Sequence, residues 1–272
     1  MGKISWEKGY PCQKNCPICA DMKQRDHCAI VVAAGRGLRM ESDTKKQYLL
    51  LQGIPILTRT VMVFHESDDI REIILVIPED DMDYCKSKIL EPYGLMDRIH
   101  LVSGGDQRQD SVFNGLKYIH NTLGFENDAI VLIHDGVRPF VNQEIIRDCI
   151  RNVIRSGACV PAVRISDTVK QVLPDLTIQK TISRENLYLT QTPQCFYLKS
   201  IFEAFEYAIN TSFLGTDEAS ILEHFGGKVQ IIKGSKLNIK ITTLEDLSLG
   251  DVICQKPKDA FTDSLLLTLK TS

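Results

Sequence analysis

The sequence lacks several features that would assign the protein to a common class. No apolar run approaches the roughly 20 residues that a membrane-spanning helix requires. The first residues include Lys3 and Glu7 without a continuous apolar stretch, so we expect no secretory signal. We therefore expect a cytoplasmic location. The net charge of −3 gives no basic excess for general nucleic-acid binding. We therefore expect neither a membrane nor a nucleic acid as partner, and any cationic site must be local.

Two common phosphate-binding patterns are also absent. The P-loop ends in Gly-Lys-Ser or Gly-Lys-Thr, and neither tripeptide occurs in the sequence. The dinucleotide-binding pattern Gly-x-Gly-x-x-Gly needs a third glycine, but Met40 stands at that place after Gly35 and Gly37. P-loop NTPases and nicotinamide- or flavin-binding enzymes are therefore disfavoured.

A different phosphate-binding stretch lies between residues 29 and 48. The apolar run Ala29–Val32 fits a buried strand, and it leads into a turn containing Gly35 and Gly37. Arg39, Lys45 and Lys46 follow this turn. A strand that runs into a glycine turn and then into cations is suited to holding a polyphosphate. The alternative is an ordinary turn after a core strand, with solvated cations beside it.

Apolar strands and amphipathic helices alternate along the first half of the 272-residue chain. After the first strand we expect strands at Ile73–Ile77, Ile99–Val102 and Ala129–Ile133, and helices at Ile54–His65, from Met82 to Ile89, from a cap at Asp110 or Ser111 to Ile119, and at Gln143–Ser156. This order predicts an α/β fold with a Rossmann-like, doubly wound, mostly parallel sheet. Ligands bind beyond the carboxyl ends of such strands, so the glycine turns after residues 34, 103 and 135 should meet at one edge.

The alternation of strands and helices breaks near residue 163. Polar and apolar residues alternate from Val163 to Ile182 around a turn at Pro174, which predicts a protruding hairpin arm over about 163–187. Such a hairpin packs on a partner chain or lies on its own domain. Beyond the arm we expect a helix through Ile201 and Phe205, a helix capped by Thr216, strands at Val229–Ile232 and Asn238–Thr242, and a closing helix at Leu244–Val252.

Four of the nine cysteines cluster near the start of the chain, at Cys12, Cys16, Cys19 and Cys28. Thiolates at this spacing suit zinc or an iron–sulfur centre. The cluster has no second half, however, and a chain that started at Met22 would keep every other feature. We therefore expect residues 1–28 to be a leader outside the fold, residues 29–254 to form the domain, and residues 255–272 to be a tail without assigned role.

The chain resembles the 2-C-methyl-D-erythritol 4-phosphate cytidylyltransferases of the non-mevalonate isoprenoid pathway. The resemblance runs from about Cys28 to Ile253 and depends on an ordered set of motifs, each of them weak alone. These are Ala33-Ala34-Gly35-x-Gly37-x-Arg39-Met40, Lys46-Gln47-Tyr48, Gly104-Gly105-Asp106-x-Arg108-x-x-Ser111, His134-Asp135-x-x-Arg138-Pro139, Arg184, Gln191-Thr192-Pro193-Gln194, Thr216-Asp217-Glu218-Ala219-Ser220 and Asn238-Ile239-Lys240-Ile241-Thr242-Thr243.

The resemblance implies transfer of CMP from CTP to methylerythritol 4-phosphate, with release of pyrophosphate. The attacking phosphate is largely dianionic at pH 7, so no general base is required, and catalysis reduces to positioning and charge neutralisation. Mg²⁺ is expected to enter with CTP and to bridge phosphate oxygens, with few carboxylate ligands from the protein. The family also uses its hairpin arm to form a homodimer, which implies the same here.

The resemblance further assigns a role to each matched residue. The catalytic residues would be Arg39 and Lys46 at the triphosphate, and Arg184 and Lys240 at the acceptor phosphate. The CTP-binding residues would be Ala33, Ala34, Gly35, Gly37, Gly105, Asp106, Arg108 and Ser111. The acceptor-binding residues would be Asp135, Arg138, Thr168, Thr192 and Thr216. Arg184 and its neighbours would serve the site of the same chain or that of the partner.

Two departures from the family and two alternative functions remain. Lys45 replaces the proline that usually precedes Lys46, which adds a cation beside the site, and Gly136-Val137 replaces the usual Ala-Ala after Asp135.

The nearest alternative function is that of a ribitol 5-phosphate cytidylyltransferase, which shares most of the motifs. A non-catalytic, nucleotide-binding regulatory module is the alternative of another class.

Overall fold

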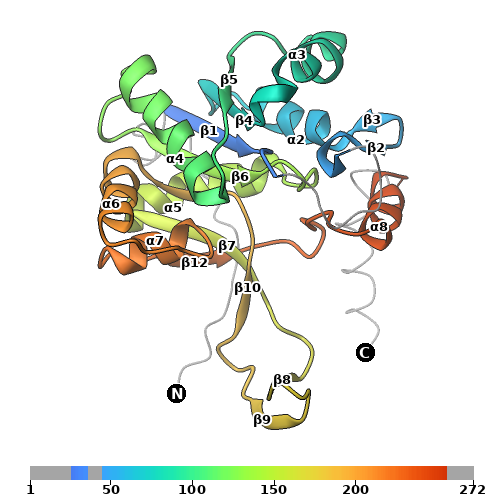
Figure 1. Cartoon of the computed structure of the whole chain (residues 1–272), viewed down its shortest axis with the longest axis vertical. Helices are drawn as coiled ribbons and strands as arrows, with labels where there is room; N and C mark the ends of the chain where they lie inside the picture. Colours follow the sequence, from blue (N-terminus) through green and yellow to red (C-terminus); the bar gives the residue numbers. More distant parts are fainter. Residues whose placement is uncertain (1–25, 36–44, 256–272) are drawn as a thin grey trace, which may run out of the picture.

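The computed structural model describes residues 26–35 and 45–255, and in them the chain forms one mixed sheet with helices on both faces (Figure 1). The strand order is β10-β7-β11-β6-β1-β4-β5, with β12 beside β7. The strands of this sheet are β1 (His27–Val32), β4 (Glu72–Ile77), β5 (Ile99–Ser103), β6 (Ile130–Asp135), β7 (Ala158–Arg164), β10 (Tyr188–Thr190), β11 (Gln194–Tyr197) and β12 (Gln230–Lys233). The predicted α/β fold is confirmed.

One half of the sheet is parallel, and it is the half that the sequence predicted. β1 pairs with β4 on one side and with β6 on the other, and β4 pairs with β5. Residues 73–77 of β4 and 130–133 of β6 are almost fully buried, which explains why these strands read as continuous apolar runs. The parallel arrangement brings the ends of β1, β4, β5 and β6 to one edge.

The other half of the sheet contains antiparallel strands that the sequence pattern did not reveal. β11 runs antiparallel to both β6 and β7, and β10 runs antiparallel to the end of β7. β12 returns parallel to β7. These strands are three to seven residues long, and β10 and β11 are separated by the cis peptide bond Thr192–Pro193.

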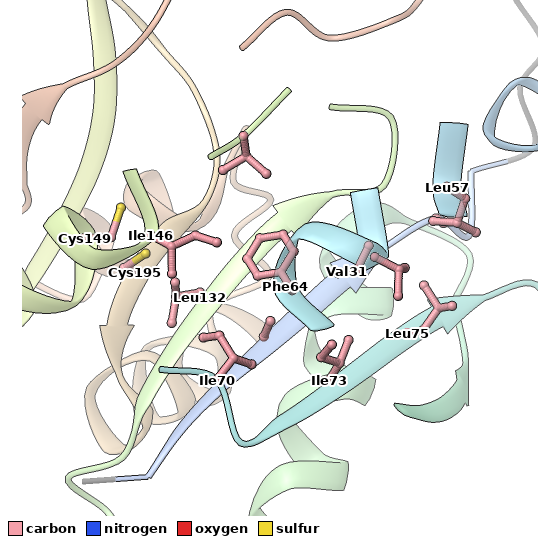
Figure 2. Packing of buried hydrophobic residues seen from close by; sticks show 14 of the residues in the cluster. Val31, Leu57, Phe64, Ile70, Ile73, Leu75, Leu132, Ile146, Cys149 and Cys195 are labelled. Carbon is pink, nitrogen blue, oxygen red and sulfur yellow. The ribbon is translucent and has the colours of Figure 1, made fainter. Parts of the chain in front are cut away.

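The helices cover the two faces of the sheet and bury a separate apolar cluster on each. α2 (Ile56–His65) and α5 (Gln143–Ser156) contribute Phe64 and Ile146 to one cluster (Figure 2). α4 (Arg108–Tyr118), α6 (Leu198–Asn210) and α7 (Glu218–His224) pack on the opposite face. Successive residues of β1 alternate between the faces, with Val31 in the first cluster and Ile30 in the second.

Shorter elements complete the domain. A two-stranded ribbon, β2 (Leu50–Leu51) with β3 (Ile54–Pro55), precedes α2 and contacts the closing helix α8 (Leu244–Gln255). The remaining elements are single helical turns or short helices: η1 (Lys46–Tyr48), η2 (Glu79–Asp81), α3 (Met82–Tyr84), η3 (Cys85–Leu90), η4 (Glu91–Tyr93) and η5 (Ile119–Leu123).

The predicted hairpin forms between β8 (Val169–Val172) and β9 (Ile178–Ile182). It projects away from the sheet, and Figure 1 shows it apart from the helices of the domain. Most of its side chains are exposed, including Leu176 at 80 % and Ile178 at 58 %. The chain therefore presents apolar side chains to solvent at the end of the arm.

Three sequence predictions of local structure are wrong. Residues 238–242 form no strand: isolated hydrogen bonds hold them instead of a strand ladder, such as Ile241 N–H to the Val137 carbonyl and Asn238 Nδ2 to the Thr192 carbonyl. α4 begins at Arg108 after the N-cap residue Gln107, earlier than Asp110 or Ser111, and Asp110 instead accepts the Gln107 N–H. Asp217, rather than Thr216, caps α7, because its carboxylate accepts the N–H of Ser220 at 2.9 Å.

The start of the fold also differs from the expected boundary. β1 begins at His27, and Cys28 is a fully buried residue of this central strand rather than part of a leader. Burial raises the pKa of the Cys28 thiol well above its ordinary value, which disfavours the thiolate that a metal would need. Cys12, Cys16 and Cys19 lie outside the described residues. Within residues 26–35 and 45–255, no helix is long and apolar enough to span a membrane.

Candidate active site

A pocket lies at the carboxyl ends of the parallel strands. Its walls come from the end of β1, the turn after β5, the start of α4, the end of β6, and the segments around Lys46 and Lys240. The described residues that line it are Val32, Ala33, Ala34, Gly35, Lys46, Gln47, Gly105, Asp106, Gln107, Arg108, Ser111, Asp135, Val137 and Lys240. The predicted convergence of the glycine turns on one edge is therefore observed.

Ten of the site residues named from the sequence line this pocket together. They are Ala33, Ala34, Gly35, Lys46, Gly105, Asp106, Arg108, Ser111, Asp135 and Lys240. The amino terminus of α4 faces the same space, and the partial positive charge of a helix amino terminus favours a bound anion. The pocket thus combines small residues, backbone N–H groups and cations, which suits a phosphorylated ligand.

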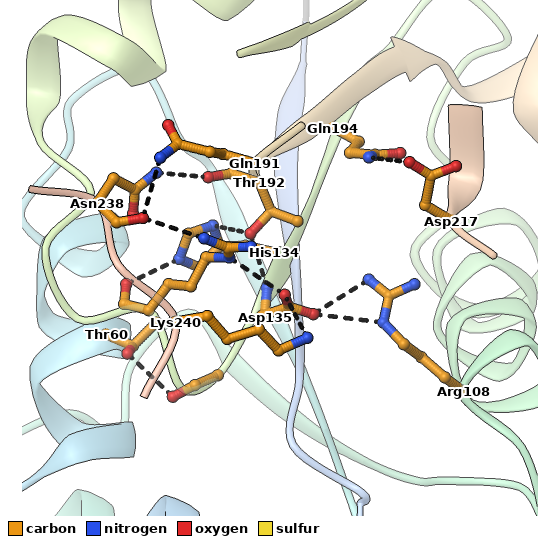
Figure 3. A network of polar contacts seen from close by, with 12 residues as sticks. Thr60, Arg108, His134, Asp135, Gln191, Thr192, Gln194, Asp217, Asn238 and Lys240 are labelled. Carbon is orange, nitrogen blue, oxygen red and sulfur yellow. Dashed lines mark hydrogen bonds and ion pairs between the residues drawn. The ribbon is translucent and has the colours of Figure 1, made fainter. Parts of the chain in front are cut away.

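A carboxylate that lines the pocket is surrounded by three cations, in a network of polar contacts that Figure 3 shows. Asp135 Oδ2 lies 3.0 Å from Lys240 Nζ and 3.2 Å from Arg138 Nε, and Oδ1 lies 3.2 Å from Arg108 Nη2. We call these four residues the Asp135 cluster. One carboxylate faces three cations in this cluster, and Arg108 also pairs with the carboxylate of Glu218, so the five side chains together carry a net charge of +1 that favours a bound anion.

The three cations also keep Asp135 ionised. Burial alone would raise the pKa of this carboxyl, whose side chain is only 8 % exposed. The charges of Arg108, Lys240 and Arg138 outweigh burial and hold its pKa well below the usual value. Asp135 is therefore a fixed anion near neutral pH rather than a proton donor or acceptor.

A chain of hydrogen bonds fixes Asp135 from behind. The Asp135 N–H donates to Thr192 Oγ1 at 3.1 Å, and the Thr192 hydroxyl in turn donates to His134 Nδ1 at 2.9 Å. His134 Nε2 then donates to the Arg138 carbonyl at 3.0 Å. Asn238 joins the same layer, because its Nδ2 donates to the Thr192 carbonyl at 2.9 Å and its carbonyl accepts from Arg138 Nη1 at 3.0 Å.

Glu218 is a residue of the site whose role the sequence did not reveal. It is fully buried at the start of α7, and its carboxylate forms an ion pair with Arg108. Burial raises the pKa of Glu218, and Arg108 opposes that effect only in part. Arg108 thus bridges Glu218 and Asp135. One feature of the sequence could have indicated that Glu218 is buried. It is followed by Ala219, Ile221 and Leu222, which are the buried apolar residues of α7.

Two glycines allow close approach of the turns that form the pocket. A Cβ added at Gly104 would lie 2.3 Å from the Cβ of Ala34, so a side chain there would separate β1 from the turn after β5. At Gly136, one of the departures from the family, an added Cβ would lie 2.9 Å from both Ala33 Cβ and Leu57 Cδ1. Ser111 also shapes the first turn, since its hydroxyl accepts the Gly105 N–H at 3.0 Å.

Lys45 does not add a cation to the pocket, contrary to the expectation from the sequence. Its Nζ lies 2.7 Å from each carboxylate oxygen of Asp81, and Lys45 does not line the pocket. The neighbouring Gln47 is buried, and its Nε2 donates to the Ala33 carbonyl at 3.0 Å. The side chain that this segment contributes as a cation is that of Lys46.

Several other residues named from the sequence lie outside the pocket lining. Arg138 and Thr192 are mostly buried behind Asp135, and Thr216 is exposed beside α7. Thr168 and Arg184 are exposed at the base of the arm, where Arg184 donates to the Ser166 carbonyl. The single chain does not bring these two residues to its own pocket. Gly37 and Arg39 lie outside the described residues.

A doubly wound sheet with a cation-lined pocket beyond its strand ends is typical of α/β proteins that bind nucleotides. Comparison with known proteins defines the class further. The family model of 2-C-methyl-D-erythritol 4-phosphate cytidylyltransferase matches residues 27–256. The curated protein of that name from Syntrophus aciditrophicus is 44% identical over 228 residues, which cover 84% of this chain and 95% of that protein. The chain therefore belongs to the 2-C-methyl-D-erythritol 4-phosphate cytidylyltransferase family.

Solved structures agree with this assignment. The 4-diphosphocytidyl-2C-methyl-D-erythritol synthase of Anaerococcus prevotii is 34% identical, with a TM-score of 0.74 over 87% of this chain and 99% of that one. The cytidylyltransferase of Francisella tularensis is also 34% identical, with a TM-score of 0.72 over 84% of this chain and 99% of that one. The fold is thus shared along almost the whole domain.

The buried His134 predicts how stability depends on pH. Burial lowers the pKa of His134 to about 4, against 6.5 for the free side chain. As the pH falls, the unfolded chain therefore takes up this proton first, so stability is complete above pH 6.5 and is lost toward pH 4. His134 should account for about 2 kcal/mol of lost unfolding free energy between pH 7 and pH 5.

Urea unfolding at several pH values measures this contribution. The variant His134→Gln should be less stable at pH 7 and should lose less stability between pH 7 and pH 5 than the unchanged protein. His120→Gln is the matched control, because His120 is exposed, and it should leave the pH dependence unchanged. An equal pH dependence in His134→Gln and the unchanged protein would contradict the assignment.

Proposed function

We propose that the protein transfers CMP from CTP to 2-C-methyl-D-erythritol 4-phosphate and releases pyrophosphate, as a step of non-mevalonate isoprenoid precursor synthesis. An oxygen of the acceptor phosphate attacks the α-phosphorus of CTP, and the bond between the α-phosphorus and the oxygen bridging to the β-phosphate breaks. The observation that carries the proposal is the Asp135 cluster, which supplies Arg108 and Lys240 to one pocket with Lys46.

The chemistry of the attacking group fits the contents of the pocket. A phosphate monoester has its second pKa near 6, so at neutral pH it needs no base to remove a proton. The barrier comes from bringing two anions together, and cations lower it more than acid–base groups do. His134 is engaged behind Asp135 through both ring nitrogens, so its position fits a structural role.

We assign the roles from the family resemblance and from the chemistry of each group. Lys46 neutralises the triphosphate and the leaving pyrophosphate, a role that the resemblance also gives to Arg39, and Lys240, held by Asp135, orients the acceptor phosphate. Ala33, Ala34 and Gly105 allow the base and ribose to approach the backbone, beside Asp106 and Ser111. Asp135 accepts hydrogen bonds from hydroxyl groups of the polyol in addition to forming its ion pairs.

We propose that Mg²⁺ binds together with CTP. Within the described residues, no group of three His, Cys, Asp or Glu side chains could hold a metal ion. Asp135 faces three cations, so it is a poor metal ligand, whereas the exposed Asp106 lies open at the pocket rim. This set of carboxylates fits a magnesium ion whose ligands are mainly phosphate oxygens and water. The ion would neutralise part of the phosphate charge.

We further propose that the active form is a homodimer in which the arm completes the partner's site. The exposed apolar side chains of the arm support this, since Leu176 and Ile178 would be covered at an interface. Thr168 and Arg184, at the base of the same arm, would then reach the pocket of the second chain.

We also propose a cytoplasmic location. It fits the six described cysteines, which are all free thiols.

A pyrophosphate-release assay with CTP and Mg²⁺ tests the proposed reaction. Methylerythritol 4-phosphate should support turnover, and Lys240→Ala should lower kcat by the equivalent of about 2–4 kcal/mol with a smaller effect on CTP affinity. Turnover with ribitol 5-phosphate alone would contradict the assigned acceptor. Tight CTP binding without turnover on either acceptor would favour a regulatory module.

Complementation between inactive chains tests the proposed dimer. When Arg184→Ala and Lys240→Ala chains are coexpressed, a shared site predicts mixed dimers with one intact site, and hence about a quarter of full activity. Lys46→Ala mixed with Lys240→Ala is the control, because both residues line the same pocket, and no activity should return. Failure of the first pair to recover activity would mean that Arg184 does not act on the partner's site.

A further inference from the structure

The turn after β4 holds the segment that carries Lys46. Asp81, the last residue of η2, accepts hydrogen bonds from Lys45 Nζ at 2.7 Å and from the Tyr48 hydroxyl at 2.8 Å. The Asp81 side chain is 13 % exposed and that of Lys45 is 34 % exposed. This ion pair is therefore screened less than a pair on the open surface.

The two donors to Asp81 lie on either side of Lys46 in the chain. Lys45 precedes it directly, and Tyr48 follows two residues later with its ring buried and 5.0 Å from that of Tyr84. Between them, Gln47 donates to the Ala33 carbonyl at 3.0 Å. Both neighbours of Lys46 are thus fixed to the domain, whereas Lys46 itself lines the pocket.

The backbone of Lys45 has a conformation that a proline at this position would also adopt. Its φ of −59° and ψ of 138° lie in the range to which a proline ring restricts the chain. The Lys45 carbonyl in this conformation accepts the Tyr48 N–H at 2.9 Å, which closes the turn η1. A flexible residue held in one backbone conformation loses more entropy than proline would, so an added restraint is useful.

We propose that Asp81 is a positioning residue for Lys46. By binding Lys45 and Tyr48 it fixes the backbone from which the Lys46 amine reaches the phosphates. Asp81 does not line the pocket, so it acts through this segment and not by contact with the ligand. The proposal rests on the proposed function, in which Lys46 neutralises the triphosphate.

Substitution of two neighbouring acids tests the role of Asp81. Asp81→Ala should lower kcat by about 10- to 100-fold, because a displacement near 1 Å can cost that much, and should change the CTP dissociation constant by less than about threefold. Asp81→Asn keeps an acceptor for Tyr48 but loses the charge that binds Lys45, so its loss should be smaller. Asp80→Ala removes the same charge from an exposed position of the same turn and should leave kcat unchanged.

Two combined variants show whether the effect passes through Lys46 and its backbone. In a Lys46→Met background, Asp81→Ala should change kcat by less than about twofold, because the group it positions is gone. Lys45→Pro should recover at least about fivefold of the kcat lost in Asp81→Ala, since its ring supplies the same φ. Equal losses in both backgrounds, or no recovery with proline, would overturn the proposal, as would a kcat of Asp81→Ala within about threefold of the unchanged protein.

A measurement that needs no turnover separates this proposal from the proposed function. Reductive ¹³C-methylation of the lysines gives a signal for Lys46, assigned by its loss in Lys46→Arg. Asp81→Ala should shift this signal, and Asp80→Ala should not. If the unchanged protein releases no pyrophosphate, the proposed function fails while this comparison still decides the positioning role. An identical Lys46 signal in Asp81→Ala and the unchanged protein would overturn that role.

Discussion

A single buried carboxylate organises the cations of this site. Asp135 lies at the end of the central strand β6 and contacts Arg108, Arg138 and Lys240, which come from three separate parts of the chain. Three cations at this spacing would repel one another without the anion between them. Asp135 therefore fixes their positions and leaves an excess positive charge for a phosphorylated ligand.

The rest of the fold keeps this carboxylate in place. The apolar clusters on both faces of the sheet fix β6 between β1 and β11. Thr192, His134 and Asn238 then form a hydrogen-bonded layer behind Asp135, and Glu218 holds Arg108 from the far side. Buried polar groups that are all hydrogen-bonded in this way favour one defined arrangement. A buried polar group without a hydrogen-bond partner would instead lower the stability of the fold.

The sequence predicted the parallel half of the sheet well because its strands are buried on both faces. β11 was missed because it has four residues and follows a proline, so its apolar pattern is too short to recognise. Residues 238–242 alternate like a strand, but they form only isolated hydrogen bonds, with Val137 and Thr192 among their partners, and pair with no strand. Only tertiary contacts determine that residues 194–197 form a strand and that residues 238–242 do not.

The pocket was predictable to the extent that its residues lie in motifs at strand ends. Arg108, Asp135 and Lys240 were named from their motifs, and the structure brings them together. The contact between Arg108 and Glu218 joins residues 110 positions apart, so no local pattern reveals it. The pairing of Lys45 with Asp81 was hidden for the same reason, and it converts an apparent site cation into part of the scaffold.

The variant Asp135→Asn tests the central claim most directly, through kcat at saturating acceptor and the CTP dissociation constant. Removal of the anion raises the positive charge of the pocket, so CTP should bind as tightly as before or more tightly. Lys240 and Arg108 lose the partner that positions them, so kcat should fall on the order of 100-fold. A kcat within about threefold of the unchanged protein, or CTP binding weakened as much as turnover, would contradict the account.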